Sequence, residues 1–467
     1  MTATSEQGIH DALAAEIRGT VIAPGGSAPE QELYDEARKV YNGMIDRKPA
    51  IIVQCADAAD VISAIRIARE NGLAISVRGG GHHANGFGVW DDALVIDLRN
   101  MKGVDVNPKE RTVRVQGGAV WGDVDHATHA FGLAVPTGII STTGVGGLTL
   151  GGGVGNLARQ CGLTIDNLIS ADVVLADGTQ VTASEKSNPD LFWALRGGGG
   201  NFGVVTSFVF RCHEVSTIVG GPVLYDIKDT GEVLRWYRET QPNLPPDLSG
   251  WFALLTVPPG PPFPEELWMR KACAVVWCYG GDPSRADEVL APVRAFGKPI
   301  LDGVAEMPLP VLQSAFDALY PAGLQWYWRA DFFREISDDA IAVHEKFGAE
   351  LPTPGSTMHL YAIDGEVNKV GATDTAFAYR DVGWAGVIVG VDPDPKNAKL
   401  LKDWTIAYWE ALHPTSAGGA YVNMMMDEGE DRIKAAYGPN YERLSKVKAK
   451  YDPGNIFHVN QNIKPAK

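Results

Sequence analysis

The chain has 467 residues, with 41 Lys or Arg and 57 Asp or Glu, so its formal net charge is −16 at pH 7. An acidic chain without a basic block argues against a nucleic-acid partner and against an anionic membrane surface. A hydrophobic content of 45% with 21% charged residues is typical of a folded globular protein, and the length predicts two or three domains.

The cysteines and the N-terminus restrict the compartment. The five cysteines are odd in number and lack zinc-site spacing, so we expect no disulfide framework and no metal site. Residues 1–20 show no cationic start followed by an apolar core, and residues 127–158 are too rich in glycine for a membrane span. The expected location is cytoplasmic.

Residues 1–215 combine short strand patterns with glycine clusters. The apolar run Ile51–Gln54 predicts a strand, and Asp57 is placed to cap a helix that follows it. A second strand is predicted over Ala74–Val77, and it leads directly into the sequence RGGGHH of residues 78–83. Further strands are predicted at 93–97 and 112–116, and a helix at 121–131.

Residues 216–420 have a different composition. Amphipathic helices are predicted near 284–296, 337–349 and 396–412, with strands such as 272–278 and 387–391 between them. Cys273 and Cys278 have opposite parity in their strand, so their side chains should point to opposite faces. This pattern favours an α+β domain with an antiparallel sheet.

Residues 421–467 return to helix and loop. A helix is predicted over 431–450, interrupted by Gly438 and Pro439, and a tail of mixed polar and apolar residues follows it. The segment Tyr421-Val422-Asn423-Met424 is interpreted as a strand, in which Tyr421 and Asn423 share one face and Met424 takes the other.

Three glycine-rich segments are candidates for binding an anionic ligand. They lie at 78–83, at 141–155 and at 197–203, and glycine lets backbone N–H groups approach a phosphate closely. The third segment matches G-x-G-x-x-G by letter, but the apolar run 204–210 that follows it predicts a strand rather than a helix. A Rossmann nicotinamide site is therefore disfavoured.

Five motifs in order carry a family resemblance: VRGGGHH, TTGVGGLTLGGGVG, CGLTIDNL, LRGGGGNFGVVTSF and YDPGNIFHVNQNI. Together they resemble the berberine-bridge-enzyme-like FAD-linked oxidases of the vanillyl-alcohol-oxidase (PCMH-type) superfamily. The resemblance implies an α+β fold with a PCMH-type FAD-binding domain and a substrate domain whose large antiparallel sheet is covered by helices. We expect the FAD-binding domain at 1–215, the substrate domain at 216–420, and a C-terminal segment at 421–467 that returns to the first domain.

The resemblance also implies FAD, attached covalently through His82. The other expected cofactor contacts are Arg78, Gly79, Gly80, Gly81, His83, Gly86, Thr142, Thr143, Gly144, Gly146, Gly147, Gly151, Gly155, Asn167, Gly200, Phe202, Gly203, Val204, Val205, Asn460 and Asn462. Doubly linked relatives carry a cysteine where this chain has Ile140, and the nearby thiol, Cys161, lies beyond the loop. A single histidyl link is therefore expected, and a second link through Cys161 is disfavoured.

The reaction implied by the resemblance is removal of a hydride from an alcohol, sugar, phenolic or amine-bearing small molecule, with dioxygen reduced to hydrogen peroxide. Thr143, next to the first glycine of its loop, favours oxidase behaviour. Relatives often use a tyrosine as the base at the position where this chain has Met424, which cannot accept a proton. The candidate bases of this chain are therefore Tyr421, Tyr327, His359 and Tyr361. The alternatives are a dehydrogenase with another acceptor and a flavin- or ligand-binding protein without turnover.

Overall fold

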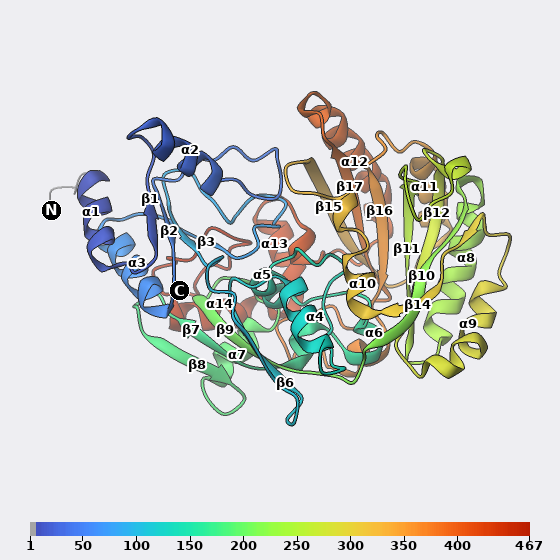
Figure 1. Ribbon diagram of the computed structural model, residues 1–467, viewed down its shortest axis with the longest axis horizontal. Helices are drawn as coiled ribbons and strands as arrows, with labels where there is room; N and C mark the ends of the chain where they lie inside the picture. Colours follow the sequence, from blue (N-terminus) through green and yellow to red (C-terminus); the bar gives the residue numbers. More distant parts are fainter. Residues whose placement is uncertain (1–5) are drawn as a thin grey trace.

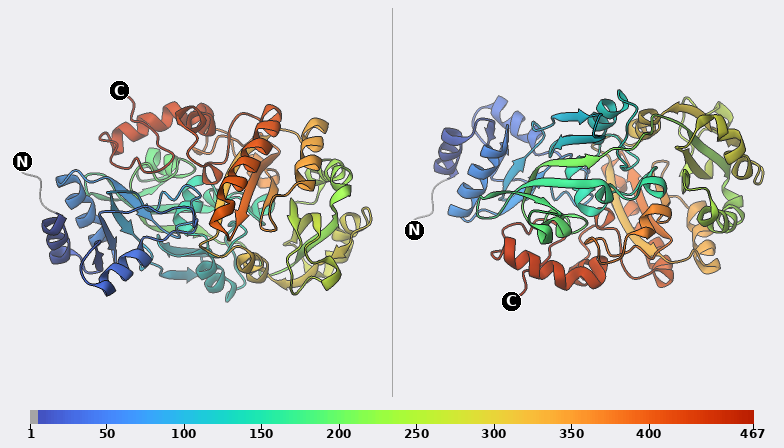
Figure 2. Two further views of the ribbon diagram at one scale, coloured as in Figure 1. Left: turned by 90° about the horizontal axis from the view of Figure 1, so that it is seen from above. Right: turned by 90° about the horizontal axis from the view of Figure 1, so that it is seen from below.

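The computed structural model describes residues 6–467 and contains three β-sheets (Figure 1). Two sheets and their helices form one half of the molecule, and the third and largest sheet forms the other half. The C-terminal helices lie beside the first half of the molecule (Figure 2). None of the helices in residues 6–467 has the length and apolar character that crossing a membrane requires.

The first half is built from a mixed sheet and an antiparallel sheet. The mixed sheet has the order β1-β2-β4-β3, in which β2, β4 and β3 run parallel, and the antiparallel sheet has the order β5-β6-β9-β7-β8. The strands are β1 (Thr20–Ile22), β2 (Ile51–Gln54), β3 (Ile75–Arg78), β4 (Leu94–Asp97), β5 (Val104–Asn107), β6 (Thr112–Gln116), β7 (Leu168–Val174), β8 (Gln180–Ser184) and β9 (Val204–Arg211). The helices are α1 (Glu6–Glu16), α2 (Ala28–Ala37), α3 (Ala58–Glu70), α4 (Trp121–His129), α5 (Val145–Gly151), α6 (Ala158–Cys161) and α7 (Pro189–Leu195).

The second half is one antiparallel sheet of eight strands. Its order is β13-β10-β12-β11-β16-β17-β15, with β14 also paired to β10. The strands are β10 (Thr217–Asp226), β11 (Leu248–Thr256), β12 (Lys271–Tyr279), β13 (Leu301–Asp302), β14 (Ala305–Pro308), β15 (Gln325–Phe333), β16 (Thr357–Ala362) and β17 (Trp384–Asp392). The helices are α8 (Thr230–Thr240), α9 (Ala286–Arg294), α10 (Leu309–Ser314), α11 (Asp338–Ala349) and α12 (Ala398–Leu412).

Side-chain alternation gives the large sheet two different faces. In β15, Trp326 and Trp328 point toward the first half, whereas Tyr327 and Arg329 point the other way, toward α12 and its neighbours. Helices α8, α9, α11 and α12 cover that outer face with an apolar layer. Cys278 lies in the inner core and Cys273 in the outer core, which confirms their predicted opposite parity.

The predicted α+β fold with a large antiparallel sheet is confirmed, and several local elements agree closely with it. β2 and β6 have the predicted bounds, and Asp57 caps α3 by accepting hydrogen bonds from the Ala59 and Asp60 amides at 2.9 and 3.2 Å. The interrupted C-terminal helix is α13 (Glu430–Tyr437) followed by α14 (Tyr441–Tyr451).

The strand interpretation of residues 421–424 is wrong. Val422–Met424 form a 3-10 turn, in which the Met424 amide donates to the Tyr421 carbonyl at 2.9 Å. The turn replaces the alternation of a strand, in which successive side chains would point to opposite faces. Tyr421, Asn423 and Met424 therefore all line the same cleft.

The C-terminal segment is anchored to the third glycine loop by a buried lysine. The Lys448 ammonium on α14 donates to the Asn201 carbonyl at 2.6 Å, to the Phe457 carbonyl at 2.9 Å and to the Asp452 carboxylate at 2.6 Å. The side chains of Lys448 and Asp452 are fully buried. The last residues of the chain are thereby held against the first half of the molecule.

Candidate flavin and substrate cleft

A deep cleft runs between the two halves of the molecule. Its cavity volume is about 370 Å³, which lies within the roughly 300–1,000 Å³ typical of small-molecule sites. One wall is formed by the glycine loops and the C-terminal tail. The opposite wall is formed by the inner face of β15, β16 and β17. We call these the glycine wall and the aromatic wall.

The glycine wall depends on two loops that touch backbone to backbone. The loop after β3 places Gly80 against Gly144, and a Cβ atom on either residue would come within 3.0 Å of backbone atoms of the other. The second loop is held from behind, because the Trp121 amide donates to the Thr143 carbonyl at 3.0 Å and the Ser141 amide donates to the Asp317 carboxylate at 3.0 Å. Glycine is therefore required for this approach.

The glycine wall also has the properties of a ligand cradle. At Gly147 and Gly200, an added Cβ would meet nothing within 4 Å, so both residues border open space in the cleft. Asn460 donates to the Gly200 carbonyl at 3.1 Å, while its own carbonyl oxygen is buried without a partner among residues 6–467. Space that only glycine leaves open, next to an unpaired polar atom, fits a cofactor held by backbone groups.

The cleft brings together most of the predicted cofactor contacts. Those that line it are Gly79, Gly80, Gly81, His82, His83, Thr143, Gly144, Gly146, Gly147, Gly200, Gly203, Val205 and Asn460. The others lie behind this lining: Arg78, Gly86, Thr142, Gly151, Gly155, Asn167, Phe202, Val204 and Asn462.

Contacts within the protein account for two of the residues behind the lining, Arg78 and Asn167. The Arg78 guanidinium donates to the carbonyls of Ala37 and Lys39, so it fixes the segment after α2. The side-chain amide of Asn167 donates to the Cys161 carbonyl at 2.9 Å and to the Leu163 carbonyl at 3.0 Å. These side chains shape the glycine wall from behind.

His82 lies where the two walls meet. Its ring stacks on Tyr41 with centroids 4.0 Å apart, and Tyr41 in turn stacks on Trp326 at 5.2 Å. Burial lowers the pKa of His82 to about 4, and a hydrogen bond with the Thr142 backbone opposes this shift. His82 is therefore uncharged at neutral pH and keeps a nitrogen lone pair, as a nucleophilic or ligating imidazole requires.

The two other residues considered for flavin attachment have different surroundings. His83 packs on Phe87 at 4.5 Å, and its Nδ1 accepts a hydrogen bond from the Asn85 amide at 3.1 Å. Cys161 borders a separate hollow beside Cys212, and burial raises the pKa of its thiol to about 12. Thiolate formation at Cys161 is thus strongly disfavoured.

The aromatic wall presents alternate residues of three strands. Trp326 and Trp328 from β15 contact each other edge to face at 5.9 Å, and their indole N–H groups are buried without a partner among residues 6–467. His359 and Tyr361 from β16 are joined by a hydrogen bond of 2.7 Å between Nδ1 and the phenol oxygen. This wall combines ring surfaces with a few polar atoms, as small-molecule sites do.

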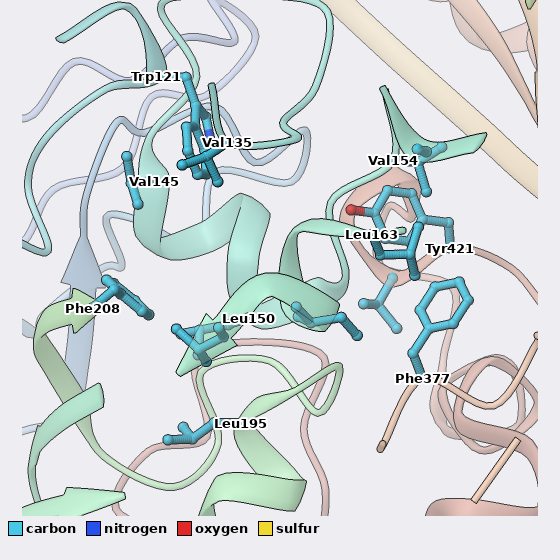
Figure 3. Close-up of a cluster of buried hydrophobic side chains, with 14 of the residues drawn as sticks. Trp121, Val135, Val145, Leu150, Val154, Leu163, Leu195, Phe208, Phe377 and Tyr421 are labelled. Atoms are coloured by element: carbon cyan, nitrogen blue, oxygen red, sulfur yellow. The ribbon is translucent and has the colours of Figure 1, made fainter. Parts of the chain in front are cut away.

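Tyr421 reaches the cleft from the 3-10 turn and is held firmly. Its phenol oxygen accepts hydrogen bonds from the Gly153 amide at 2.8 Å and from the Asn423 side-chain amide at 2.9 Å. Burial raises the pKa of Tyr421 to about 12, and these two donors act against that shift. Its ring lies beside Phe377 and Val154 (Figure 3).

Tyr327, another predicted base, lies on the far face of the large sheet. The Arg329 guanidinium carbon and the Lys402 ammonium nitrogen lie 5.4 and 5.8 Å from the centre of its ring. Tyr327 does not line the cleft. The reason is the period of two in β15, because the neighbours Trp326 and Trp328 occupy the inner face. The sequence alone did not indicate which of the two alternating sets of residues in β15 faces the cleft.

The sequence analysis missed several lining residues, among them Tyr41 and Tyr320. Tyr41 enters the cleft from the segment between α2 and β2, where its phenol donates to the Tyr320 carbonyl at 2.6 Å. Tyr320 itself lines the cleft beside β15. Neither residue belongs to a repeated pattern, so only the tertiary structure could reveal them.

The lining of the cleft carries no Asp, Glu, Lys or Arg within residues 6–467. Its three histidines have pKa values lowered by burial, and burial raises the pKa values of Tyr41, Tyr320, Tyr361, Tyr421 and Tyr437. The cleft is therefore electrically neutral around pH 7 before any ligand binds.

Comparisons with known proteins agree with this geometry. Residues 49–184 match the FAD binding domain family, and residues 420–464 match the berberine and berberine-like family. An FAD-linked oxidoreductase of Dictyostelium discoideum is 32% identical over 96% of this chain and 95% of its own length. The (R)-6-hydroxynicotine oxidase of Paenarthrobacter nicotinovorans is 30% identical over 96% and 97%. A solved chitooligosaccharide oxidase superposes with a TM-score of 0.82 at 26% identity, covering 98% of this chain and 100% of that one.

Proposed function

Because the chain belongs to the berberine-bridge-enzyme-like family of FAD-linked oxidoreductases, we propose that it is an oxidase carrying one covalently attached FAD. In this proposal it takes a hydride from a small alcohol, sugar, phenolic or amine and passes the electrons to dioxygen, which yields hydrogen peroxide. The observation that carries the proposal is the neutral cleft that joins the glycine wall to the aromatic wall, with His82 at the junction. Relatives named for a nicotine and an oligosaccharide substrate support a small-molecule donor.

The glycine wall would hold the dinucleotide. The open space at Gly147 and Gly200 leaves room for the pyrophosphate of FAD beside backbone N–H groups. FAD supplies the hydride-accepting ring when bound. The uncharged His82 ring, held by its stack on Tyr41, is the attachment residue of this proposal.

Tyr421 is the base of this proposal for an alcohol substrate. Its oxygen accepts hydrogen bonds from the Gly153 amide and the Asn423 side chain, and the Val154 backbone also acts to lower its pKa, so these groups stabilise the phenolate. With its pKa raised to about 12, only a small fraction is ionised at neutral pH, and this fraction grows tenfold for each pH unit. The rate of alcohol oxidation should therefore rise with pH.

The activity test begins with a panel of donors under anaerobic conditions. The protein, expressed with FAD, is mixed with primary alcohols, oligosaccharides, phenolic alcohols and cyclic amines, and bleaching of the flavin identifies the donor. Readmission of oxygen should restore the colour and release one peroxide per donor oxidised. Restoration only by an artificial acceptor would show a dehydrogenase, and failure of every donor would favour a binding protein without turnover.

The proton acceptor is tested with a matched pair of variants. Tyr421→Phe should lower the rate of flavin bleaching by an alcohol by about 10²–10⁴-fold and abolish its rise with pH. Tyr327→Phe removes a phenol of β15 that faces away from the cleft, and it should change neither value. An unchanged pH profile in Tyr421→Phe would reject Tyr421 as the base.

A further inference from the structure

His359 and Tyr361 form an isolated polar pair on the aromatic wall. Both come from β16, where residues two apart share one face. The His359 Nδ1 and the Tyr361 phenol oxygen are 2.7 Å apart, and neither side chain makes another hydrogen bond among residues 6–467. Trp251 packs on both rings, at 4.9 Å from His359 and 5.6 Å from Tyr361.

The surroundings keep this imidazole neutral. Burial lowers the pKa of His359 to about 3, and burial raises the pKa of the Tyr361 phenol. The groups that face the pair are Trp251 and Tyr320, and no carboxylate, lysine or arginine lines the cleft within the described chain. A neutral imidazole carries one N–H, and the hydrogen bond at one nitrogen decides which nitrogen bears it.

Hydrogen-bond accounting selects one tautomer. If Nδ1 carried the proton, it would donate to the Tyr361 oxygen, and the phenol proton of Tyr361 would be buried without an acceptor. If the phenol donates to Nδ1 instead, both of these groups are satisfied, and the proton of His359 lies on Nε2. The second arrangement avoids the cost of a buried unpaired donor, which is about 1–3 kcal/mol.

The remaining N–H is directed at the ligand space. Nε2 of His359 has no hydrogen-bond partner among residues 6–467, and it is not fully buried by the protein. Since His359 lines the cleft, Nε2 borders the cleft. We propose that Tyr361 fixes His359 as a neutral hydrogen-bond donor, and that His359 positions the substrate through an acceptor lone pair of that substrate. This assignment replaces the role of base that the sequence suggested for both residues.

The proposal defines a substrate class within the proposed function, on which it rests. The ligand is an uncharged ring compound that carries a ring nitrogen, an ether oxygen or a carbonyl oxygen as acceptor. Carboxylates and protonated amines are disfavoured, because the cleft offers no opposite charge to compensate for their loss of water. Tyr361 acts through His359 and is a positioning residue.

The first test measures the tautomer directly in the flavin-loaded protein. With ¹⁵N-labelled histidine, NMR should show a His359 ring protonated at Nε2, bare at Nδ1 and unchanged between about pH 6 and pH 9. The signal is assigned by its absence in His359→Gln. In Tyr361→Phe, the two tautomers should become mixed. A ring protonated at Nδ1, or one that titrates in this range, would overturn the proposal.

The second test uses two probes that differ only in an acceptor atom. Binding of 3-pyridinemethanol and of benzyl alcohol is followed by the change in flavin absorption at about pH 8, where the pyridine is uncharged. The wild-type protein should bind the pyridine about 2- to 10-fold more tightly, which is the value of one hydrogen bond. Equal affinities would reject the donor role.

Three variants separate this role from a structural one. His359→Leu should lose the preference for pyridine, and His359→Gln, which keeps a donor, should retain part of it. The control is His344→Leu, because His344 of α11 forms the same kind of pair with Tyr408 of α12, at 2.6 Å, in the helical layer that covers the outer face of the sheet. It should lower stability and leave the preference unchanged, and a lost preference there would contradict the assignment.

The two proposals can fail independently. The tautomer is read without any substrate, so an Nε2 tautomer in a protein that releases no peroxide would contradict only the oxidase function. Peroxide release with equal binding of both probes would contradict only the role of His359.

Discussion

The two walls of the cleft are built by different means. The glycine wall is made of backbone, and its shape depends on the absence of Cβ atoms at positions such as Gly80 and Gly144. The aromatic wall is made of side chains that project from alternate positions of β15, β16 and β17. A backbone wall can accept few substitutions, whereas a side-chain wall can change its ligand without changing the fold. We therefore expect mutations of the glycine wall to affect cofactor and stability, and those of the aromatic wall to affect substrate.

The largest expected effect comes from Lys448, which fastens the C-terminal tail to the glycine wall. Lys448→Met would leave the Asp452 carboxylate buried and unpaired, at a cost of about 3–5 kcal/mol in unfolding free energy. Urea unfolding measures this loss. Lys450→Met is the control, because its ion pair with Asp190 is exposed and should contribute less than about 1 kcal/mol. Equal effects of the two variants would contradict the anchoring role.

Gly80→Ala should break the glycine wall itself. The new Cβ meets backbone atoms of Gly144, so the two loops must separate, at about 1–3 kcal/mol, and flavin binding should be lost. Gly147→Ala is the informative comparison, because its Cβ meets only the open space of the cleft. It should keep the stability of the wild type while weakening flavin binding, and full flavin content in both variants would show that FAD binds elsewhere.

Asp125 should make the stability of the glycine wall depend on pH. This residue of α4 is buried, one carboxyl oxygen lacks a partner among residues 6–467, and burial together with Asp317 raises its pKa to about 7. The folded protein then holds a proton that the unfolded chain releases near pH 4. Stability therefore falls as the pH rises from about 4 to about 7. Asp125→Asn should reduce this fall and stabilise the protein by on the order of 2 kcal/mol at pH 8, as measured by urea unfolding. An unchanged pH dependence would exclude Asp125 as its source.

The smallest effect is expected on the aromatic wall. Trp328→Leu should weaken the binding of benzyl alcohol by about 2- to 10-fold, because an aromatic contact is worth about 0.5–1.5 kcal/mol, and flavin content should stay constant. Tyr327→Leu changes the next residue of the same strand on the opposite face and should leave this affinity unaltered. If both variants lost affinity equally, the division of β15 into two faces would not govern binding.

The same contrast explains what the sequence could predict. Backbone constraints leave a signature in the residues themselves, so the glycine segments, the strands at 51–54 and 112–116 and the cap at Asp57 were predictable. Strand alternation reveals which residues share a face but not which face is inside. For that reason Tyr327 and His359 were equal candidates until the sheet was oriented against the first half.

Other features depend on contacts between distant segments. Tyr41 stacks on His82 because Asn42 bridges the Ala84 carbonyl at 2.6 Å and the Trp326 carbonyl at 3.1 Å, which joins three segments far apart in the chain. The turn at 422–424 likewise follows from the contacts of Tyr421 with Gly153. Local sequence contains no trace of either arrangement.

The measurement that tests the central claim most directly is acid precipitation of the purified, flavin-loaded protein. We predict that the flavin colour stays with the precipitate in the wild-type protein and in Cys161→Ala, and that it moves to the supernatant in His82→Ala. Flavin that stays with the precipitate of His82→Ala would show a different attachment residue. Flavin released from the wild-type protein would contradict the covalent link at the junction of the two walls.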